Sequence, residues 1–96
     1  SAIGYGWAMV LGEIVPNRRG KLLSRGAAFA DSRRVCNVHF KSDVEAGGVV
    51  AKSVFKALLS DPAFVADLAA AKAEAKALKR VKPECSAENA ALKLTR

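Results

Sequence analysis

Apolar residues recur at every third or fourth position through most of this chain of 96 residues. The clearest case is a stripe with four-residue spacing at Ala46, Val50, Val54 and Leu58. Such spacing places side chains on one face of an α-helix, whereas a β-strand with one buried face shows strict alternation. No segment has that alternation, and aromatic residues make up only 6% of the chain. The sequence therefore predicts an all-α fold, a helical bundle with a thin core.

Proline and short polar stretches divide the first part of the chain into helices. The first predicted helix covers residues 2–15 and is ended by Pro16, which cannot continue the backbone hydrogen-bond ladder. A second covers residues 17–30, where Gly26 can let a neighbouring helix come close. The polar residues 31–32 then favour a break between helices.

Two further helices are expected. The third begins at His39 or at Ser42, whose spacing with Glu45 matches a capping box, and it carries the apolar stripe. The fourth begins after Asp61, which can cap it, with Pro62 in its first turn.

The chain is long enough for one domain or part of one. We expect residues 1–82 to belong to a helical domain and residues 83–96 to form a loose tail of mixed polar residues. No apolar run approaches the roughly 18 residues that cross a bilayer, so no membrane span is expected.

The chain is basic, with 16 Lys and Arg against 9 Asp and Glu and a formal charge of +7. Such an excess can mark a nucleic-acid-binding surface. Here the basic residues are scattered, and no aromatic side chains lie between them to stack on bases. A solvated basic surface is therefore the prediction, and not nucleic-acid binding.

Cys36 and Cys85 are the only cysteines, and they lack the spacing of a zinc or thioredoxin-like site. One disulfide would suit an exported protein and two free thiols a cytosolic one. The separation in sequence leaves both states open.

One segment carries groups that could act together in catalysis. The only histidine, His39, is followed four residues later by Asp43, and on a continuous helix this spacing brings the two side chains within hydrogen-bonding reach. A carboxylate on one imidazole nitrogen fixes the tautomer and stabilises the charge that forms when the other nitrogen reacts. Arg33 supplies a planar fork of donors that suits phosphoryl oxygens. The same pattern is also common as a partly exposed surface contact, so the residue types alone leave both interpretations open.

The spacing of these residues resembles a known signature. Ser-Arg, five residues, His, three residues and Asp is similar to the third signature motif of the superfamily of type 2 phosphatidic acid phosphatases, class A acid phosphatases and vanadium haloperoxidases. Its four positions are Ser32, Arg33, His39 and Asp43. The surrounding residues look like the bacterial class A branch, and the resemblance extends over residues 1–79.

The resemblance implies the C-terminal half of that family's helical fold. The first two signatures of the superfamily are absent, and the start of the chain resembles the segment directly after the second signature, Pro-Ser-Gly-His. We therefore expect residues 1–82 to be the C-terminal part of an acid phosphatase domain that lacks its N-terminal half. Such a fragment is expected to be inactive alone.

The resemblance also implies residue roles. His39 would be the nucleophile of a phosphomonoester hydrolase and form a phosphohistidine that water hydrolyses. Asp43 would orient His39, and Arg33 would bind the phosphoryl oxygens. Ser32 is expected to cap a helix or to donate a hydrogen bond from behind these groups, and not to react. Arg34 stands where the family has an apolar residue; it could reach the bound anion, but we expect it to lie on the surface.

The resemblance implies no cofactor and no metal. The expected ligands are a phosphomonoester substrate and inorganic phosphate, and the expected location is the periplasm or the outside of the cell. The missing N-terminal half or a second copy of the chain is the expected protein partner.

Two other functions fit the same residues. A vanadate-dependent haloperoxidase of this superfamily would use the same ligands, because vanadate resembles the phosphoryl transition state. The chain could also be a non-catalytic basic helical fragment that binds anions or another protein.

Overall fold

Regular structure is helical throughout residues 1–79 and 81–94, the part of the chain that this computed structural model describes. The elements are α1 (Ala2–Ile14), a 3₁₀ turn η1 (Pro16–Arg18), α2 (Arg19–Val35), α3 (Lys41–Leu58), α4 (Pro62–Ala77) and α5 (Ser86–Leu94). The predicted all-α fold is confirmed.

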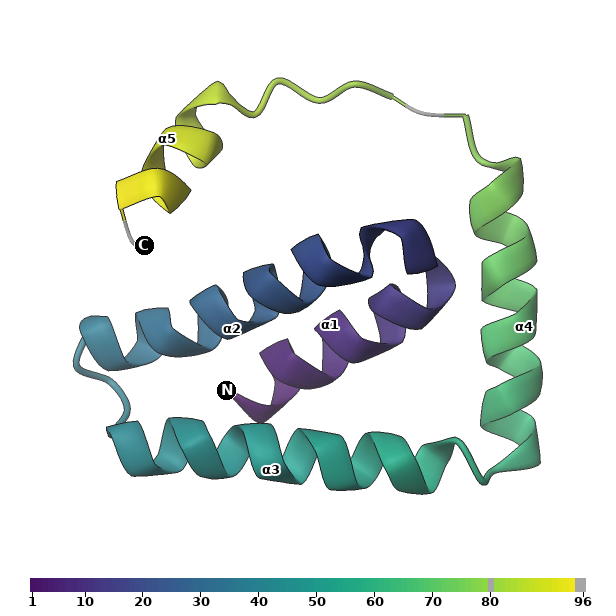
Figure 1. Cartoon of the computed structure of the whole chain (residues 1–96), viewed down its shortest axis with the longest axis horizontal. Helices are drawn as coiled ribbons and strands as arrows, with labels where there is room; N and C mark the ends of the chain where they lie inside the picture. The colour runs from purple at the N-terminus through teal and green to yellow at the C-terminus, as the bar shows by residue number, and fades with distance from the viewer. Residues whose placement is uncertain (80, 95–96) are drawn as a thin grey trace.

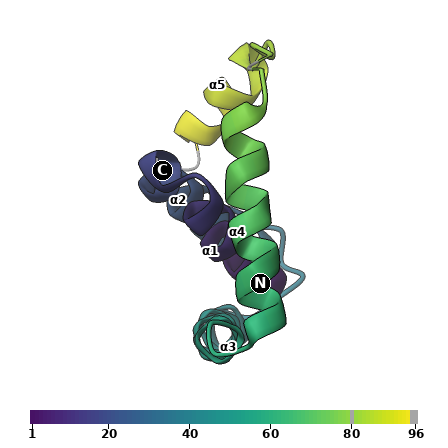
Figure 2. The same cartoon turned by 90° about the vertical axis from the view of Figure 1, so that its right-hand side faces the viewer.

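The helices form a thin layer with α1 at its centre. α1 lies between α2 and α3, and α4 runs across their ends and also packs on α1 (Figure 1). Seen edge-on, the molecule is narrow (Figure 2). Its extents are 38 × 34 × 17 Å, and the shortest is only somewhat more than the roughly 10–12 Å diameter of one helix. Most helices therefore keep one side uncovered.

Two glycines let α1 lie close to its neighbours. A Cβ atom built on Gly26 of α2 would lie 2.5 Å from the Cβ of Ala8 and 3.0 Å from the carbonyl oxygen of Gly4. A Cβ atom on Gly47 of α3 would lie 2.9 Å from the backbone nitrogen of Ala2. The prediction that Gly26 lets a helix come close is confirmed.

The core is as thin as predicted. Its buried apolar residues are Ala8, Ala30, Val44, Ala51 and Leu68. No large side chain in the described ranges is fully buried. Small side chains at the contacts bring the helices together, while most large apolar side chains lie outside the core.

The first helix ends at Ile14, one residue earlier than predicted. Val15 has φ −125° and ψ 75°, outside the helical region. The ring of Pro16 clashes with a helical conformation at the residue before it, so the helix stops there. The next residues form η1 before α2 begins.

The predicted break at residues 31–32 is wrong, because α2 continues to Val35. The Ser32 hydroxyl donates a hydrogen bond to the carbonyl oxygen of Phe29 at 2.6 Å. Asp31 forms an ion pair with Arg34 at 2.9 Å, one helical turn further on. Both polar side chains are thus satisfied within the helix and do not end it.

The start of α4 agrees with the prediction. Pro62 is its first residue, and Oδ1 of Asp61 accepts hydrogen bonds from the backbone N–H groups of Ala63 at 2.9 Å and Phe64 at 3.4 Å. The carboxylate therefore caps two of the N–H groups that a helix start leaves without partners.

Residues 86–94 differ from the predicted loose tail, because they form the helix α5. The hydroxyl and the backbone N–H of Ser86 hydrogen-bond the carboxylate of Glu84 and hold its pKa below the ordinary value. Glu88, in the first turn of α5, forms an ion pair with Arg25 of α2. Residues 95–96 of the predicted tail lie outside the described residues, and a domain boundary after residue 82 stays a prediction.

None of the helices in the described ranges has the length and hydropathy needed to cross a membrane.

Candidate active site

The chain turns from α2 into α3 through a motif that depends on Asn37. Asn37 has a left-handed φ of 58°. Its N–H donates to the carbonyl of Arg34 at 2.9 Å, and the N–H of Val38 donates to the carbonyl of Arg33 at 3.1 Å. This is the hydrogen-bond pattern of a Schellman motif, in which glycine or asparagine takes the left-handed position. Asn37 is therefore the residue in the sequence that marks the end of α2. The prediction of a break at residues 31–32 did not take it into account.

The motif places His39 beside the end of α2. The backbone N–H of His39 donates to the carbonyl oxygen of Arg33 at 3.2 Å, the same oxygen that accepts from Val38. Two residues that the sequence predicts for one site are therefore neighbours through the main chain.

The imidazole of His39 is held by Asp43 from the first turn of α3. Its Nδ1 lies 3.0 Å from Oδ1 of Asp43. The other carboxylate oxygen, Oδ2, accepts a hydrogen bond from the backbone N–H of Phe40 at 3.2 Å.

The contact forms by a different route from the predicted one. His39 precedes the helix and Phe40 is its N-cap, so the two side chains do not lie on one continuous helix, and the predicted Ser42–Glu45 capping box is wrong. Asp43 is the third residue of α3, and a carboxylate there can reach back over the helix start.

This arrangement leaves the two ring nitrogens of His39 in different surroundings. A carboxylate can only accept a hydrogen bond, so Nδ1 carries the proton and the lone pair of the neutral ring lies on Nε2. No described residue occupies Nε2, and 43% of the His39 side chain is exposed. The imidazole is therefore oriented on one side and open on the other.

The three remaining predicted residues have different surroundings. Arg33 lies in the last turn of α2, and its guanidinium has no carboxylate partner within residues 1–79 and 81–94. Arg34 pairs with Asp31, in agreement with the predicted surface position. Ser32 bonds to the carbonyl of Phe29, so its predicted alternative role as a helix cap is wrong. The structure does not bring the Ser32 hydroxyl to His39.

Other reactive groups are sparse. No cluster of three or more His, Cys, Asp or Glu side chains that could hold a metal ion occurs in the ranges that the structure covers. Cys36 and Cys85 are both free thiols.

Comparison with known proteins gives several relatives named as acid phosphatases, of which three are described here. The chain is 41% identical over 80 residues to a non-specific acid phosphatase of Providencia stuartii, covering 83% of this chain and 32% of that protein. It is 38% identical over 74 residues to an acid phosphatase of Zymomonas mobilis, covering 77% of this chain and 28% of the relative. It is 40% identical over 74 residues to a non-specific acid phosphatase of Salmonella typhimurium. This match covers 77% of this chain and 30% of the relative.

The helical fold and these relatives together define the class: the chain is homologous to part of the non-specific acid phosphatases. It spans about a third of the length of the relatives that it matches. No protein-family model and no solved structure matches it.

Proposed function

We propose that this chain supplies the nucleophile and one phosphate-binding group to the active site of a phosphomonoester hydrolase. The observation that carries the proposal is the hydrogen bond between Nδ1 of His39 and Asp43, which leaves Nε2 open. The proposal also draws on the homology to acid phosphatases.

In the first chemical step, Nε2 of His39 attacks the phosphorus atom of the substrate. A bond forms between nitrogen and phosphorus, and the bond from phosphorus to the ester oxygen breaks. The imidazole then carries a positive charge, which the Asp43 carboxylate at 3.0 Å stabilises. The leaving oxygen takes its proton from an acid that this proposal assigns to another part of the complete enzyme.

In the second step, water attacks the phosphohistidine. The bond between nitrogen and phosphorus breaks, inorganic phosphate leaves and the neutral imidazole is restored. Asp43 keeps the proton on Nδ1 in both steps, so the same ring nitrogen is available in each turnover.

Arg33 is the proposed phosphate-binding residue. Its backbone adjoins His39, and its guanidinium has no competing carboxylate in the described part of the chain. An arginine fork can bind two phosphoryl oxygens and stabilise the charge that develops on them.

The proposed enzyme needs more chain than these 96 residues. One arginine is a small part of the electrostatic stabilisation that phosphoryl transfer requires. We therefore propose that further donors and the general acid come from the portion that the relatives have and this chain does not cover. By the same homology, we propose a periplasmic or secreted location.

The test uses the complete enzyme and a phosphomonoester labelled on phosphorus. Rapid acid-free quenching during turnover should trap label on the protein that is stable to alkali and lost in acid, on a peptide containing His39. The His39→Ala variant should trap none and lose turnover. Label on another residue, or normal turnover of His39→Ala, would show that His39 is not the nucleophile.

A further inference from the structure

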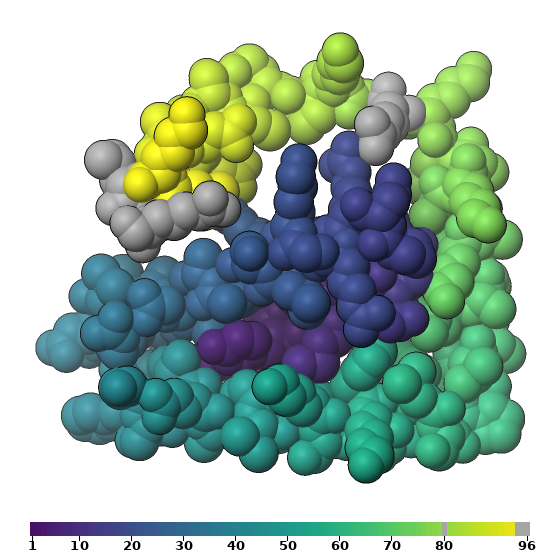
Figure 3. All heavy atoms as spheres, viewed as in Figure 1, coloured from purple at the N-terminus to yellow at the C-terminus, as the bar shows by residue number. Residues whose placement is uncertain are grey.

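The two parts of the candidate site are placed by a helix that carries neither of them. Arg33 lies in the last turn of α2, and Asp43 lies in the first turn of α3. α2 and α3 pack mainly on α1 and only slightly on each other. In the space-filling view, α1 lies in a furrow between them (Figure 3). The contacts of α1 with its two neighbours therefore set the distance between the end of α2 and the start of α3.

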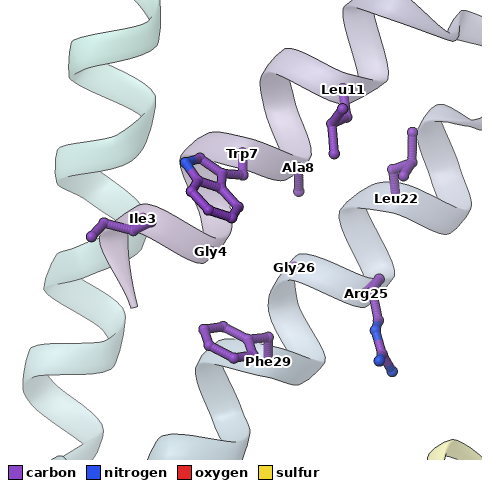
Figure 4. Close-up of a pocket in the computed structure, with 9 residues that line it drawn as sticks. All are labelled: Ile3, Gly4, Trp7, Ala8, Leu11, Leu22, Arg25, Gly26 and Phe29. Carbon is purple, nitrogen blue, oxygen red and sulfur yellow. The ribbon is translucent and has the colours of Figure 1, made fainter. Parts of the chain in front are cut away.

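On the α2 side, the close contact is made by Gly26. Gly4 and Ala8 of α1 lie opposite Gly26 (Figure 4). Gly26 comes seven residues before Arg33 in the same helix, which is about two turns. Because an α-helix is stiff over this length, the contact at Gly26 also places Arg33 relative to α1.

On the α3 side, Gly47 meets the backbone of α1. A Cβ atom on Gly47 would lie 2.9 Å from the backbone nitrogen of Ala2 and 2.9 Å from the Cβ of Ser1, whereas ordinary contact begins near 3.4 Å. Neither atom is the end of a flexible side chain, so neither can turn aside. The Ser1 hydroxyl is buried and has no hydrogen-bond partner in the described ranges, which is a further sign of close contact. A methyl group on Gly47 would have to move α1 and α3 apart by about 0.5 Å, the difference between these distances.

This contact lies one turn from the carboxylate that holds the imidazole. Gly47 follows Asp43 by four residues, so the two are neighbours on one side of α3. His39 is attached to both helices, through its backbone N–H to the carbonyl of Arg33 at 3.2 Å and through Nδ1 to Asp43 at 3.0 Å. A side chain that is held from two elements depends on the distance between them, and catalytic groups must stay within about 0.5 Å of their working geometry.

We propose that Gly47 is a positioning residue for His39. Its lack of a side chain lets α3 approach α1 closely enough to keep Asp43 at hydrogen-bonding distance from the imidazole. A larger residue would move Asp43 away from a ring whose backbone stays attached to α2. Nδ1 would then lose its acceptor, and the ring would no longer be kept in the tautomer whose lone pair lies on Nε2. The inference rests on the proposed function only for the effect on turnover.

The first test reads the tautomer directly and needs no substrate. His39 is the only histidine of the chain, so a chain without a polyhistidine tag gives one pair of ring-nitrogen NMR signals. In mildly alkaline solution, where the ring is neutral, the shifts of these signals distinguish a proton on Nδ1 from a proton on Nε2. We expect the Nδ1–H form to predominate in the original chain and Gly47→Ala to shift the signals toward the Nε2–H form.

Gly48→Ala is the matched control. It makes the same replacement in the next residue of α3, so its effect on helix propensity is the same. A Cβ atom on Gly48 would lie 3.4 Å from the nearest atom of the Tyr5 ring, which is an ordinary contact with a side chain. Gly48→Ala should therefore keep the ring signals of the original chain.

The second test measures turnover of the complete enzyme. Gly47→Ala should lower kcat by about 10- to 100-fold, since small misplacements of reacting groups have effects of this size. The inhibition constant of inorganic phosphate should change by less than about threefold, because Arg33 stays on α2. Gly48→Ala should change both quantities by less than about twofold. A residue that only stabilised the fold would lower the melting temperature and leave kcat of the folded enzyme unchanged.

The outcomes separate this inference from the proposed function. An unchanged tautomer in Gly47→Ala would overturn it, and so would a complete Gly47→Ala enzyme that does not fold, because Gly47 would then serve the fold as a whole. A similar decrease in kcat for Gly47→Ala and Gly48→Ala would overturn it as well. A shifted tautomer with unchanged kcat would support Gly47 as the positioning residue and contradict His39 as the nucleophile.

Discussion

The carboxylate of Asp43 holds two groups at once, the imidazole of His39 through Oδ1 and the first N–H of the α3 cap through Oδ2. Because each oxygen has its own partner, the carboxylate cannot rotate without losing one of them. Orientation of the imidazole is therefore tied to the start of a helix, which is a rigid part of the fold.

The variant Asp43→Asn separates these two tasks. Its amide oxygen can still accept from Phe40, but the amide cannot stabilise an imidazolium and can favour the wrong tautomer. In the complete enzyme we expect kcat to fall by about 10³–10⁴ with KM nearly unchanged. Steady-state kinetics measure kcat and KM of the variant.

The control is Glu45→Gln, which removes a neighbouring carboxylate that pairs with Lys41 at 3.7 Å. It should change kcat by less than about twofold. A decrease of less than tenfold for Asp43→Asn would contradict the orienting role.

Asn37 is the second residue on which the site depends. A β-branched side chain is strained at its φ of 58°, so Asn37→Val should lower the free energy of unfolding of the chain by about 1–2 kcal/mol. Asn37→Gly should stay within about 0.5 kcal/mol of the original, since glycine adopts this conformation freely. Urea unfolding followed by circular dichroism compares the two. If both variants lowered the free energy of unfolding equally, the left-handed conformation of Asn37 would not be the reason that this residue stabilises the chain.

For single residues, the sequence predicted which side chains are in contact better than it predicted the geometry of the contact. The four-residue spacing of His39 and Asp43 correctly predicted their contact, although His39 precedes the helix. The role of the Ser32 side chain could not be predicted, because a serine can cap a helix or bond to the carbonyl three residues before it. Which of the two occurs depends on whether α2 continues past Ser32.

Close contact of α1 and α2 is the element-level feature most open to test. Gly26→Ala would bring a methyl group to 2.5 Å from the Cβ of Ala8, so the helices must separate, at a loss of about 1–3 kcal/mol. Gly20→Ala is the control, because nothing lies within 4 Å of its Cβ position, and alanine there should add about 0.5–1 kcal/mol. Urea unfolding of both variants gives the comparison. A stabilising Gly26→Ala would mean that the two helices do not pack as described.

Elements whose ends depend on local chemistry could be predicted, and those that depend on distant contacts could not. Asp61 and Pro62 specify the start of α4 by themselves. By contrast, α5 is a short helix in a polar stretch, and its one ion pair to the rest of the described chain joins Glu88 to Arg25, 63 residues away. Such short helices are marginal without outside contacts, which explains why the sequence predicted a loose tail.

For the whole molecule, the proposal predicts that this chain alone is not a competent phosphatase. Removal of one preorganised donor commonly lowers a rate by about 10²–10³, and here several donors and the general acid are proposed to lie elsewhere. The chain should show no turnover of p-nitrophenyl phosphate at acidic pH above that of its own His39→Ala variant. Turnover equal to that of the Providencia stuartii enzyme would mean that all catalytic groups lie within these 96 residues.

The layered arrangement also has a consequence for the order of folding. α1 and α2 are joined by a three-residue 3₁₀ turn, so the main neighbour of α1 is also the next helix along the chain. Such contacts close short loops at a small entropic cost and form quickly. The layer is therefore able to assemble ahead of the surfaces that cover it. During that interval its apolar side is open to any neighbouring chain, so a slow arrival of its cover favours aggregation over native assembly.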